Sequence, residues 1–375
     1  MKNKKRFPSL LSFIASLDLT VILLLFMSVL VVWGTLYQVN HGIYAAQQRF
    51  FKAWYTMIGG FIPFPAVKCI ALCLSLNLIA QVFKKRKLSL KTAGVYITHI
   101  GVIVLVVSSA ISAYLVKEAT ITLQKGQSTQ EAYDLSTWQL EIMERGSNGT
   151  KEFSIPAQQL KKGKTINLPE AAATLVIDHF YDNCSAMIDQ HDHVTVQALK
   201  PRSAEKESGH NIPGATVHIR QAGDKSASKE SSANLYAAVE RPVVFSVNNT
   251  TVAVSLVPRQ MSLPLKIILQ SFDVQWHPGT NKAKSFRSTI RGLGKNIDRE
   301  VAIEMNRPFR YGAYTFYQMS YSGSEGHYAT SLAVVFNPLR YMPYVASIIV
   351  VAGLLLHFLV KLTSALTSSG GIRRE

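Results

Sequence analysis

The sequence predicts an α+β membrane protein with four transmembrane helices and a large, mostly β (sandwich or partly open barrel) extracytoplasmic domain between the third and the fourth helix. Three observations support this fold class. Of the 375 residues, 48% are hydrophobic and only 17% are charged. Four stretches are apolar over roughly 20 residues, the length that crosses a bilayer. After Val116 the pattern changes to short runs in which apolar and polar residues alternate, which is the signal of β-strands.

The predicted helices are residues 19–37, 66–83, 94–116 and 341–360. The first apolar run is too long for a usual signal peptide, and the "VVWGTLYQ" that follows does not resemble a cleavage site, so we expect it to remain as an anchor. The domain organisation predicted on this basis is a membrane part in 1–116, a β domain in 117–340, and a last helix with a tail in 341–375.

Charge predicts the orientation of these helices. The chain carries a formal net charge of +17, most of it near the apolar stretches. Basic clusters precede the first helix, separate the second from the third, and follow the fourth: Lys2, Lys4, Lys5, Arg6; Lys84, Lys85, Arg86, Lys87, Lys91; Lys361, Arg373, Arg374. By the positive-inside rule, both termini are cytoplasmic and residues 117–340 lie on the outer, periplasmic side of a bacterial cytoplasmic membrane. Topology therefore accounts for the basic charge, and we expect no nucleic-acid partner.

Between the first two helices, "NHGIYAAQQRFFKAWYTMIGGFIPFP" is aromatic and weakly basic. Two interpretations remain open. The segment could form an amphipathic helix on the outer surface with Phe50, Phe51, Trp54 and Tyr55 at the level of the headgroups. Equally, it could be an ordered loop packed beneath the β domain.

Two histidines lie inside predicted helices. His99 is about 8 Å from the cytoplasmic end of the third helix, and His357 lies at a comparable depth in the fourth. Ionisable groups within membrane helices often mark a function, and imidazole is a common axial ligand of haem iron. The structural alternative is a neutral histidine that hydrogen-bonds to a neighbouring hydroxyl or carbonyl group.

The second helix carries Cys69, Cys73, Asn77 and Gln81 at a spacing of four, which places them along one stripe. We expect the two amides to donate hydrogen bonds to other helices. The cysteines lack the further ligands of a metal site, and the chain contains no C-x-x-C or C-x-x-C-H motif.

In the β domain, "HFYDNCSAMIDQHDH" places His191 and His193 on one face of a strand, where they could bind a metal or haem. A polar loop explains the same residues. The chain has no G-x-S-x-G, Walker-type or H-E-x-x-H motif, so no standard catalytic pattern is present.

Several stretches resemble the ResB family, also called CcsB, of system II cytochrome c biogenesis. "IASLDLTVILLL" and "WGTLYQ" are similar to its first helix and its exit, and "SLNLIAQVFKK" to its second. "YITHIGVIVLVVS" resembles its third helix, with an H-x-G at His99 and Gly101. "MNRPFRYGAYTFYQMSY" is similar to the stretch before its last helix. The resemblance spans nearly the whole chain, although residues 125–290 match only in general texture.

The resemblance implies the membrane subunit of a cytochrome c synthase, which carries or presents noncovalent haem b for covalent attachment to apocytochrome c. It implies that His99 is an axial ligand; His357 as a possible second ligand rests on depth alone. It also implies a partner of the CcsA or ResC type that bears a W-W-D motif, which this chain lacks. The chain would thus be at most the non-catalytic subunit of a haem lyase. The alternative is a membrane-anchored scaffold whose β domain binds apocytochrome or partner proteins without haem. A small-solute transporter is disfavoured because no inverted repeat is evident.

Overall fold

The structure is a computed structural model, and it describes residues 10–83, 89–146, 149–189, 195–203, 205, 210–221, 231–280, 282–295, 297–324 and 326–370. The chain forms two compact units. The helical unit comprises Met1–Lys117, Tyr311–Tyr314 and Phe336–Glu375, and the β domain comprises Glu118–Arg310 and Thr315–Val335.

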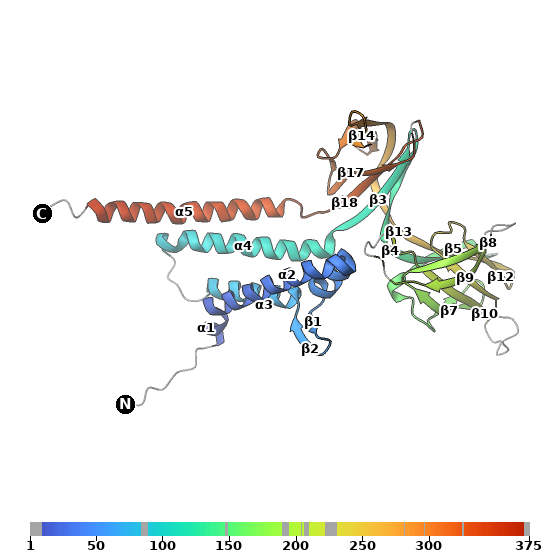
Figure 1. Cartoon of the computed structure of the whole chain (residues 1–375), viewed down its shortest axis with the longest axis horizontal. Coiled ribbons are helices and arrows are strands. Elements are labelled where there is room, and N and C mark those ends of the chain that lie inside the picture. Colours follow the sequence, from blue (N-terminus) through green and yellow to red (C-terminus); the bar gives the residue numbers. More distant parts are fainter. Residues whose placement is uncertain are drawn as a thin grey trace. The chain divides into compact units, whose positions relative to one another are not determined.

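The helical unit contains most of the apolar sequence (Figure 1). Its elements are α1 (Leu10–Ile14), α2 (Leu17–Ala46), the π-helix η1 (Gln47–Lys52), β1 (Tyr55–Ile58), β2 (Ile62–Pro65), α3 (Val67–Phe83), α4 (Leu90–Leu115) and α5 (Met342–Gly370). Among the described residues, three helical stretches are long and apolar enough to cross a membrane: Leu17–Lys52, Leu90–Leu115 and Met342–Thr367. The second predicted span, α3, is apolar but only 17 residues long, so length alone does not establish four spans.

Local sequence chemistry determines where these helices begin and turn. Ser16 is the N-cap of α2, and its hydroxyl oxygen accepts a hydrogen bond from the backbone N–H of Leu19 at 3.2 Å. Ser89 caps α4 together with Thr92 in a capping box. Near the other end of α2, Gly42 has φ 82° and ψ 162°, a conformation that favours glycine. This kink lets η1 pack back onto α2.

The segment after Gly42 does not form the amphipathic surface helix that the sequence allowed. It continues α2, forms the six-residue η1, and then forms the β1–β2 hairpin. The expected position of Phe50 at the headgroups was wrong, because its side chain is fully buried, with its ring centroid 4.9 Å from that of Trp33. Gly34 lies beside this cluster, and a Cβ there would lie 3.3 Å from the Phe51 ring, which is tighter than ordinary contact.

A polar network joins α1, α2 and α3. The Asn77 amide of α3 donates to the carbonyl oxygens of Ile14 and Ser16 at the α1–α2 break. Its oxygen accepts from the Thr20 hydroxyl at 2.8 Å and from the Gln81 amide at 2.9 Å. The expectation that Asn77 and Gln81 donate is confirmed. In apolar surroundings, these bonds satisfy backbone groups that the helix break leaves open.

Replacing Asn77 with leucine is expected to destabilise the helical unit by about 1–3 kcal/mol, because two carbonyl groups and a hydroxyl lose their partner without any loss of side-chain volume. Thermal unfolding of the purified chain in detergent would measure this effect. Gln81→Leu is the control: its amide donates only to side-chain oxygens, so its effect should be smaller. Equal melting temperatures for wild type and Asn77→Leu would contradict the role of the network.

The large β domain that the sequence predicted is confirmed in its mostly β character. Its strands are β3 (Lys117–Gln124), β4 (Ser128–Gly146), β5 (Gly149–Pro156), β6 (Thr165–Leu168), β7 (Ala173–Tyr181), β8 (Cys184–Asp189), β9 (Thr195–Pro201), β10 (Gly214–Gln221), β11 (Ser231–Tyr236), β12 (Val243–Val247), β13 (Thr250–Trp276), β14 (Ala283–Gly294), β15 (Ile297–Glu304), β16 (Phe309–Tyr311), β17 (Tyr314–Ser322) and β18 (Ala329–Phe336). A short 3₁₀ helix, η2 (Ala157–Gln159), follows β5.

Strand pairing divides the domain into one large and one smaller sheet. The large sheet has the order β15-β14-β13-β4-β3-β18-β17-β16, with β12 beside β13 and β5 beside β4. The smaller one has the order β11-β10-β7-β6, and β8 and β9 form a separate pair. Alternating residues of β4, β7, β10 and β13 fill the space between the two sheets, with Leu140, Leu175, Val217 and Val254 fully buried.

The longest strands, β4 and β13, lie side by side and extend through both halves of the domain (Figure 1). β13 starts after a tight turn in which Asn248 and Asn249 have φ values of 48° and 66°. Two successive positive φ values are typical of the type I′ turn, and asparagine tolerates them better than most residues. This turn fixes the register of β12 against β13.

Candidate functional site

Helices α4 and α5 approach each other closely at small residues. A Cβ atom at Gly94 would lie 2.5 Å from the backbone nitrogen of His357, and one at Gly353 would lie 2.5 Å from that of Thr98. Gly101 faces Val350 in the same way, and a Cβ atom at Gly101 would lie 2.9 Å from the backbone nitrogen of Val350. Small residues let membrane helices pack backbone against backbone. The seven-residue spacing of Gly94 and Gly101 was the sequence signal for this interface, and sequence reasoning missed it.

His99 is half-buried on α4, and its hydrogen bonding determines its tautomer. Its Nδ1 lies 2.8 Å from the carbonyl oxygen of Val95. A carbonyl can only accept, so Nδ1 carries the proton and donates. Nε2 is then unprotonated, and no described residue forms a hydrogen bond with it. A neutral imidazole with one nitrogen held by a backbone carbonyl and the other free is the form that binds a metal.

His357 lies at the α4–α5 interface. Its backbone faces Gly94, and its Nδ1 atom is buried with no hydrogen-bond partner among the described residues. A buried imidazole nitrogen without a partner costs free energy unless something else satisfies it.

The structure does not bring the two imidazoles together. His99 follows Gly94 by five residues, which puts it about 7.5 Å further along α4 than the level of His357. At 100° per residue, His99 also points about 140° away from the direction in which Gly94 faces α5. His357 as a second ligand on the same iron therefore stays a prediction, and it would require α4 to rotate against α5.

The metal-ligand pair His191 and His193 lies outside the described residues. In the part of the chain that the structure describes, no group of three or more histidine, cysteine or acidic residues could hold a metal ion. Of the neighbouring candidates, Asp189 accepts a hydrogen bond from Gln197 at 3.0 Å.

Cys184, at the start of β8, is buried, with Sγ 3.7 Å from the carbonyl oxygen of Ile212. It packs over Gly214, where a Cβ would lie 2.6 Å from the sulfur. Burial raises the pKa of the Cys184 thiol to about 11. The thiol thus stays protonated at neutral pH, and this form is a poor nucleophile and a poor metal ligand.

Cys184 is expected to resist alkylation in the folded chain. Since its raised pKa keeps the thiolate fraction small below about pH 11, iodoacetamide should label it very slowly at pH 8 and faster as the pH rises. Mass spectrometry of a Cys69→Ala, Cys73→Ala variant would follow this one thiol, and the same variant in denaturant should label rapidly. Complete labelling of the native variant at pH 8 within the time of the denatured control would contradict the prediction.

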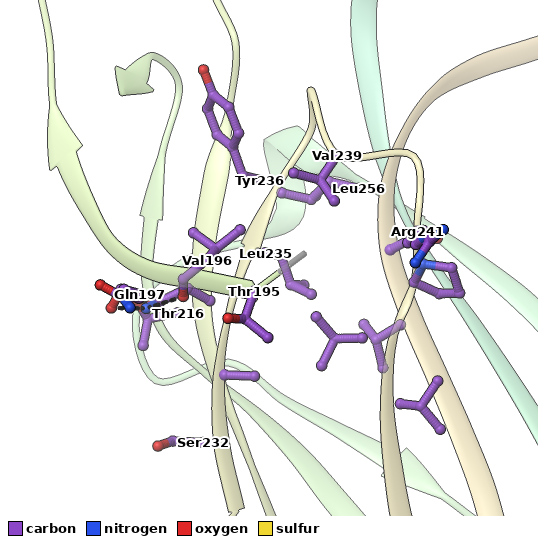
Figure 2. A pocket seen from close by; sticks show the side chains of 17 residues that line it. Thr195, Val196, Gln197, Thr216, Ser232, Leu235, Tyr236, Val239, Arg241 and Leu256 are labelled. Atoms are coloured by element: carbon purple, nitrogen blue, oxygen red, sulfur yellow. Dashed lines mark hydrogen bonds between the residues drawn. The ribbon is translucent and has the colours of Figure 1, made fainter. Parts of the chain in front are cut away.

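A pocket of about 890 Å³ opens in the β domain, between β9 and β11 on one side and β12 and β13 on the other. Its walls are partly apolar, with Leu235, Val239 and Leu256, and partly polar. Figure 2 shows Arg241 on the right, apart from Gln197 and Thr216 on the left. Arg241 is exposed, and no acidic residue is among the described residues that line the pocket. This pocket could not be predicted from the sequence, because its lining comes from separate strands.

Two comparisons with known proteins bear on this arrangement. Residues 240–329 match the model of the ResB-like family. This segment covers β12 to β17 and the start of β18, and includes "MNRPFRYGAYTFYQMSY". Protein NrfI of Wolinella succinogenes is 21% identical over 305 residues, which cover 80% of this chain. The matched part is 31% of NrfI, so the chain spans about a third of the length of this relative.

Proposed function

Because this chain is a member of the ResB-like family, as the match over residues 240–329 and the similarity to NrfI support, we propose that it acts in cytochrome c biogenesis. In this role it is the membrane subunit of a system II cytochrome c synthase. It carries or presents haem for covalent attachment to apocytochrome c on the outer side of the membrane.

One observation carries the haem part of the proposal: the free Nε2 of His99 in an apolar helix. Nδ1 is fixed by Val95, so Nε2 can serve as an axial ligand without a change of tautomer. When bound, haem would supply an iron centre whose potential the imidazole tunes. His357 as the second ligand stays a prediction, because His99 points away from the side of α4 that packs against α5.

The proposed arrangement has four spans. α3 has 17 residues, at the lower end of the range that crosses a bilayer, and the chain enters it from the β1–β2 hairpin. The basic clusters support cytoplasmic termini and a periplasmic β domain. This orientation puts His99 in the cytoplasmic half of the bilayer, and it puts the basic stretch of the sequence at 84–87 on the cytoplasmic side, where positive charge would suit the haem propionates.

The proposed partner is a second membrane protein that bears a W-W-D motif. This chain has four tryptophans, Trp33, Trp54, Trp138 and Trp276, which are widely separated.

The second candidate function is a scaffold whose β domain binds apocytochrome. The pocket between β11 and β12 favours it, because its apolar and polar walls and the exposed Arg241 suit an extended peptide.

The two candidates differ in haem content. The chain should be purified from membranes with its partner, and haem b measured by its Soret band and by pyridine haemochrome. Stoichiometric haem that is lost with the His99 substitution described below supports haem handling. A colourless complex that still matures cytochrome c would support the scaffold instead.

A further inference from the structure

The β1–β2 hairpin exposes an apolar surface that no described residue of the helical unit covers. Residues 54–65 contain no charged side chain. Phe61, next to the tip glycines Gly59 and Gly60, is 76% exposed. The other exposed apolar or aromatic side chains are Trp54, Tyr55, Met57, Ile58 and Ile62. A patch of this kind on one short hairpin indicates contact with lipid or with another protein.

The hairpin lies beside the apolar part of α2. The Phe64 ring of β2 packs against Phe26 with their centroids 5.5 Å apart. Phe26 is nine residues from the start of α2, about 14 Å along the helix, so it is inside a hydrocarbon core of about 30 Å that α2 enters near Leu19. α3 begins two residues after β2. In Figure 1 the hairpin extends sideways from α2 and α3. In the orientation proposed above, Phe26 lies about 10 Å from the cytoplasmic edge of this core, which is inside the hydrocarbon and not at a headgroup region.

One backbone edge of the hairpin, that of β2, suits a place with little water. Arg49 Nη2 donates to the carbonyl oxygen of Met57 at 3.0 Å. Met57 and Pro63 are opposite each other in the hairpin, so the backbone polar groups of each point outward and not toward the other strand. The same outward orientation recurs two residues on, at the Tyr55–Pro65 pair. Because both outward positions of β2 are proline, this edge has no N–H group to leave unsatisfied.

The same prolines disfavour an added strand beside β2. A protein that extended this sheet through β2 would need the N–H groups that Pro63 and Pro65 lack. Lipid needs none, and Trp54 and Tyr55 at the base are residues typical of the membrane interface. Arg49 also donates to Thr56 at 3.2 Å and lies over the Tyr37 ring at 4.9 Å, which ties the hairpin to α2 and fixes its direction.

We propose that the β1–β2 hairpin is a membrane anchor whose exposed apolar side chains contact the acyl chains of phospholipid. It extends the short α3 and sets the depth of α2 and α3 in the membrane. The inference uses the proposed membrane orientation but not haem binding, so its test is independent of haem.

The test uses the full chain in phosphatidylcholine nanodiscs, with Cys69, Cys73 and Cys184 replaced by alanine and a nitroxide attached to Phe61→Cys. Oxygen concentrates in acyl chains, whereas a water-soluble nickel complex does not. We expect higher accessibility to oxygen than to nickel at position 61. The matched control is Thr280→Cys, which lies at an exposed turn of the β domain and should show the opposite ratio.

Two results would overturn the proposal. Nickel accessibility at position 61 equal to that at position 280 would place the hairpin in water, and low accessibility to both reagents would mean that protein covers it. A second measurement keeps the native cysteines: with Trp33, Trp138 and Trp276 replaced by phenylalanine, brominated phospholipids should quench Trp54 emission. Unquenched emission would contradict lipid contact.

Discussion

Replacing His99 with glycine is expected to remove most of the haem from the purified complex and to lower its affinity for haem by about tenfold or more. The reason is that Nε2 is the ligand atom in the proposed function, and even the loss of a group that only supports a metal ligand costs about 10–100-fold. The measurement is the Soret absorbance per mole of complex. Since glycine leaves a space of imidazole shape, added free imidazole should restore part of the band.

His357→Ala is the matched control for this experiment. It removes an imidazole from the neighbouring helix, but not the one with a free Nε2 and a fixed tautomer. We expect it to keep its haem. Unchanged haem content in His99→Gly would refute His99 as a ligand, and loss of haem in His357→Ala alone would assign the ligand to the other helix.

Replacing Gly353 with leucine is expected to separate α4 from α5 and to destabilise the helical unit by about 3 kcal/mol or more. Its Cβ would meet the backbone nitrogen and the hydroxyl of Thr98, each at 2.5 Å, and backbone cannot move aside as a flexible side chain can. A larger side chain in a well-packed space costs about 1–3 kcal/mol of stability even where only neighbouring side chains have to move.

Ala352→Leu is the matched control, because Ala352 is the adjacent residue on α5 and is exposed. Thermal unfolding in detergent and the amount of chain recovered from membranes would compare the two variants. If both melted at the same temperature, the close approach of α4 and α5 would not contribute to stability.

The helices could be predicted from the sequence because apolar length is a strong signal. The predicted spans 66–83 and 94–116 agree closely with α3 (Val67–Phe83) and α4 (Leu90–Leu115). The first helix, α2, extends nine residues beyond the predicted end, since the polar residues after Tyr37 remain helical up to and beyond the kink at Gly42.

The rotation of the helices could not be predicted. The depth of a residue in a helix follows from counting residues, and by this count His99 and His357 lie at comparable depths. Direction depends on which face packs against a neighbour, and that face is set by Gly94 and Gly353. A glycine in an apolar run has little individual signal, so the contact it permits is visible only when both helices are known.

The hairpin was also missed, although its turn had a sequence signal. Gly59 and Gly60 have φ values of 61° and 85°, as turn glycines do, but the surrounding residues contain too few alternations to predict strands. The aromatic residues were compatible with a surface helix and equally with an ordered loop. Phe50 is instead buried against Trp33 in the helical unit.

The position of β18 next to β3 constrains how this protein can be made. The large sheet contains both the first strand of the domain and the last, and the Thr122 and Ser331 hydroxyls lie 3.2 Å apart across them. A ribosome must therefore complete about 210 further residues after β3 before that strand acquires its second neighbour. During this interval β3 has an open edge, which can pair with another chain until β18 is in place.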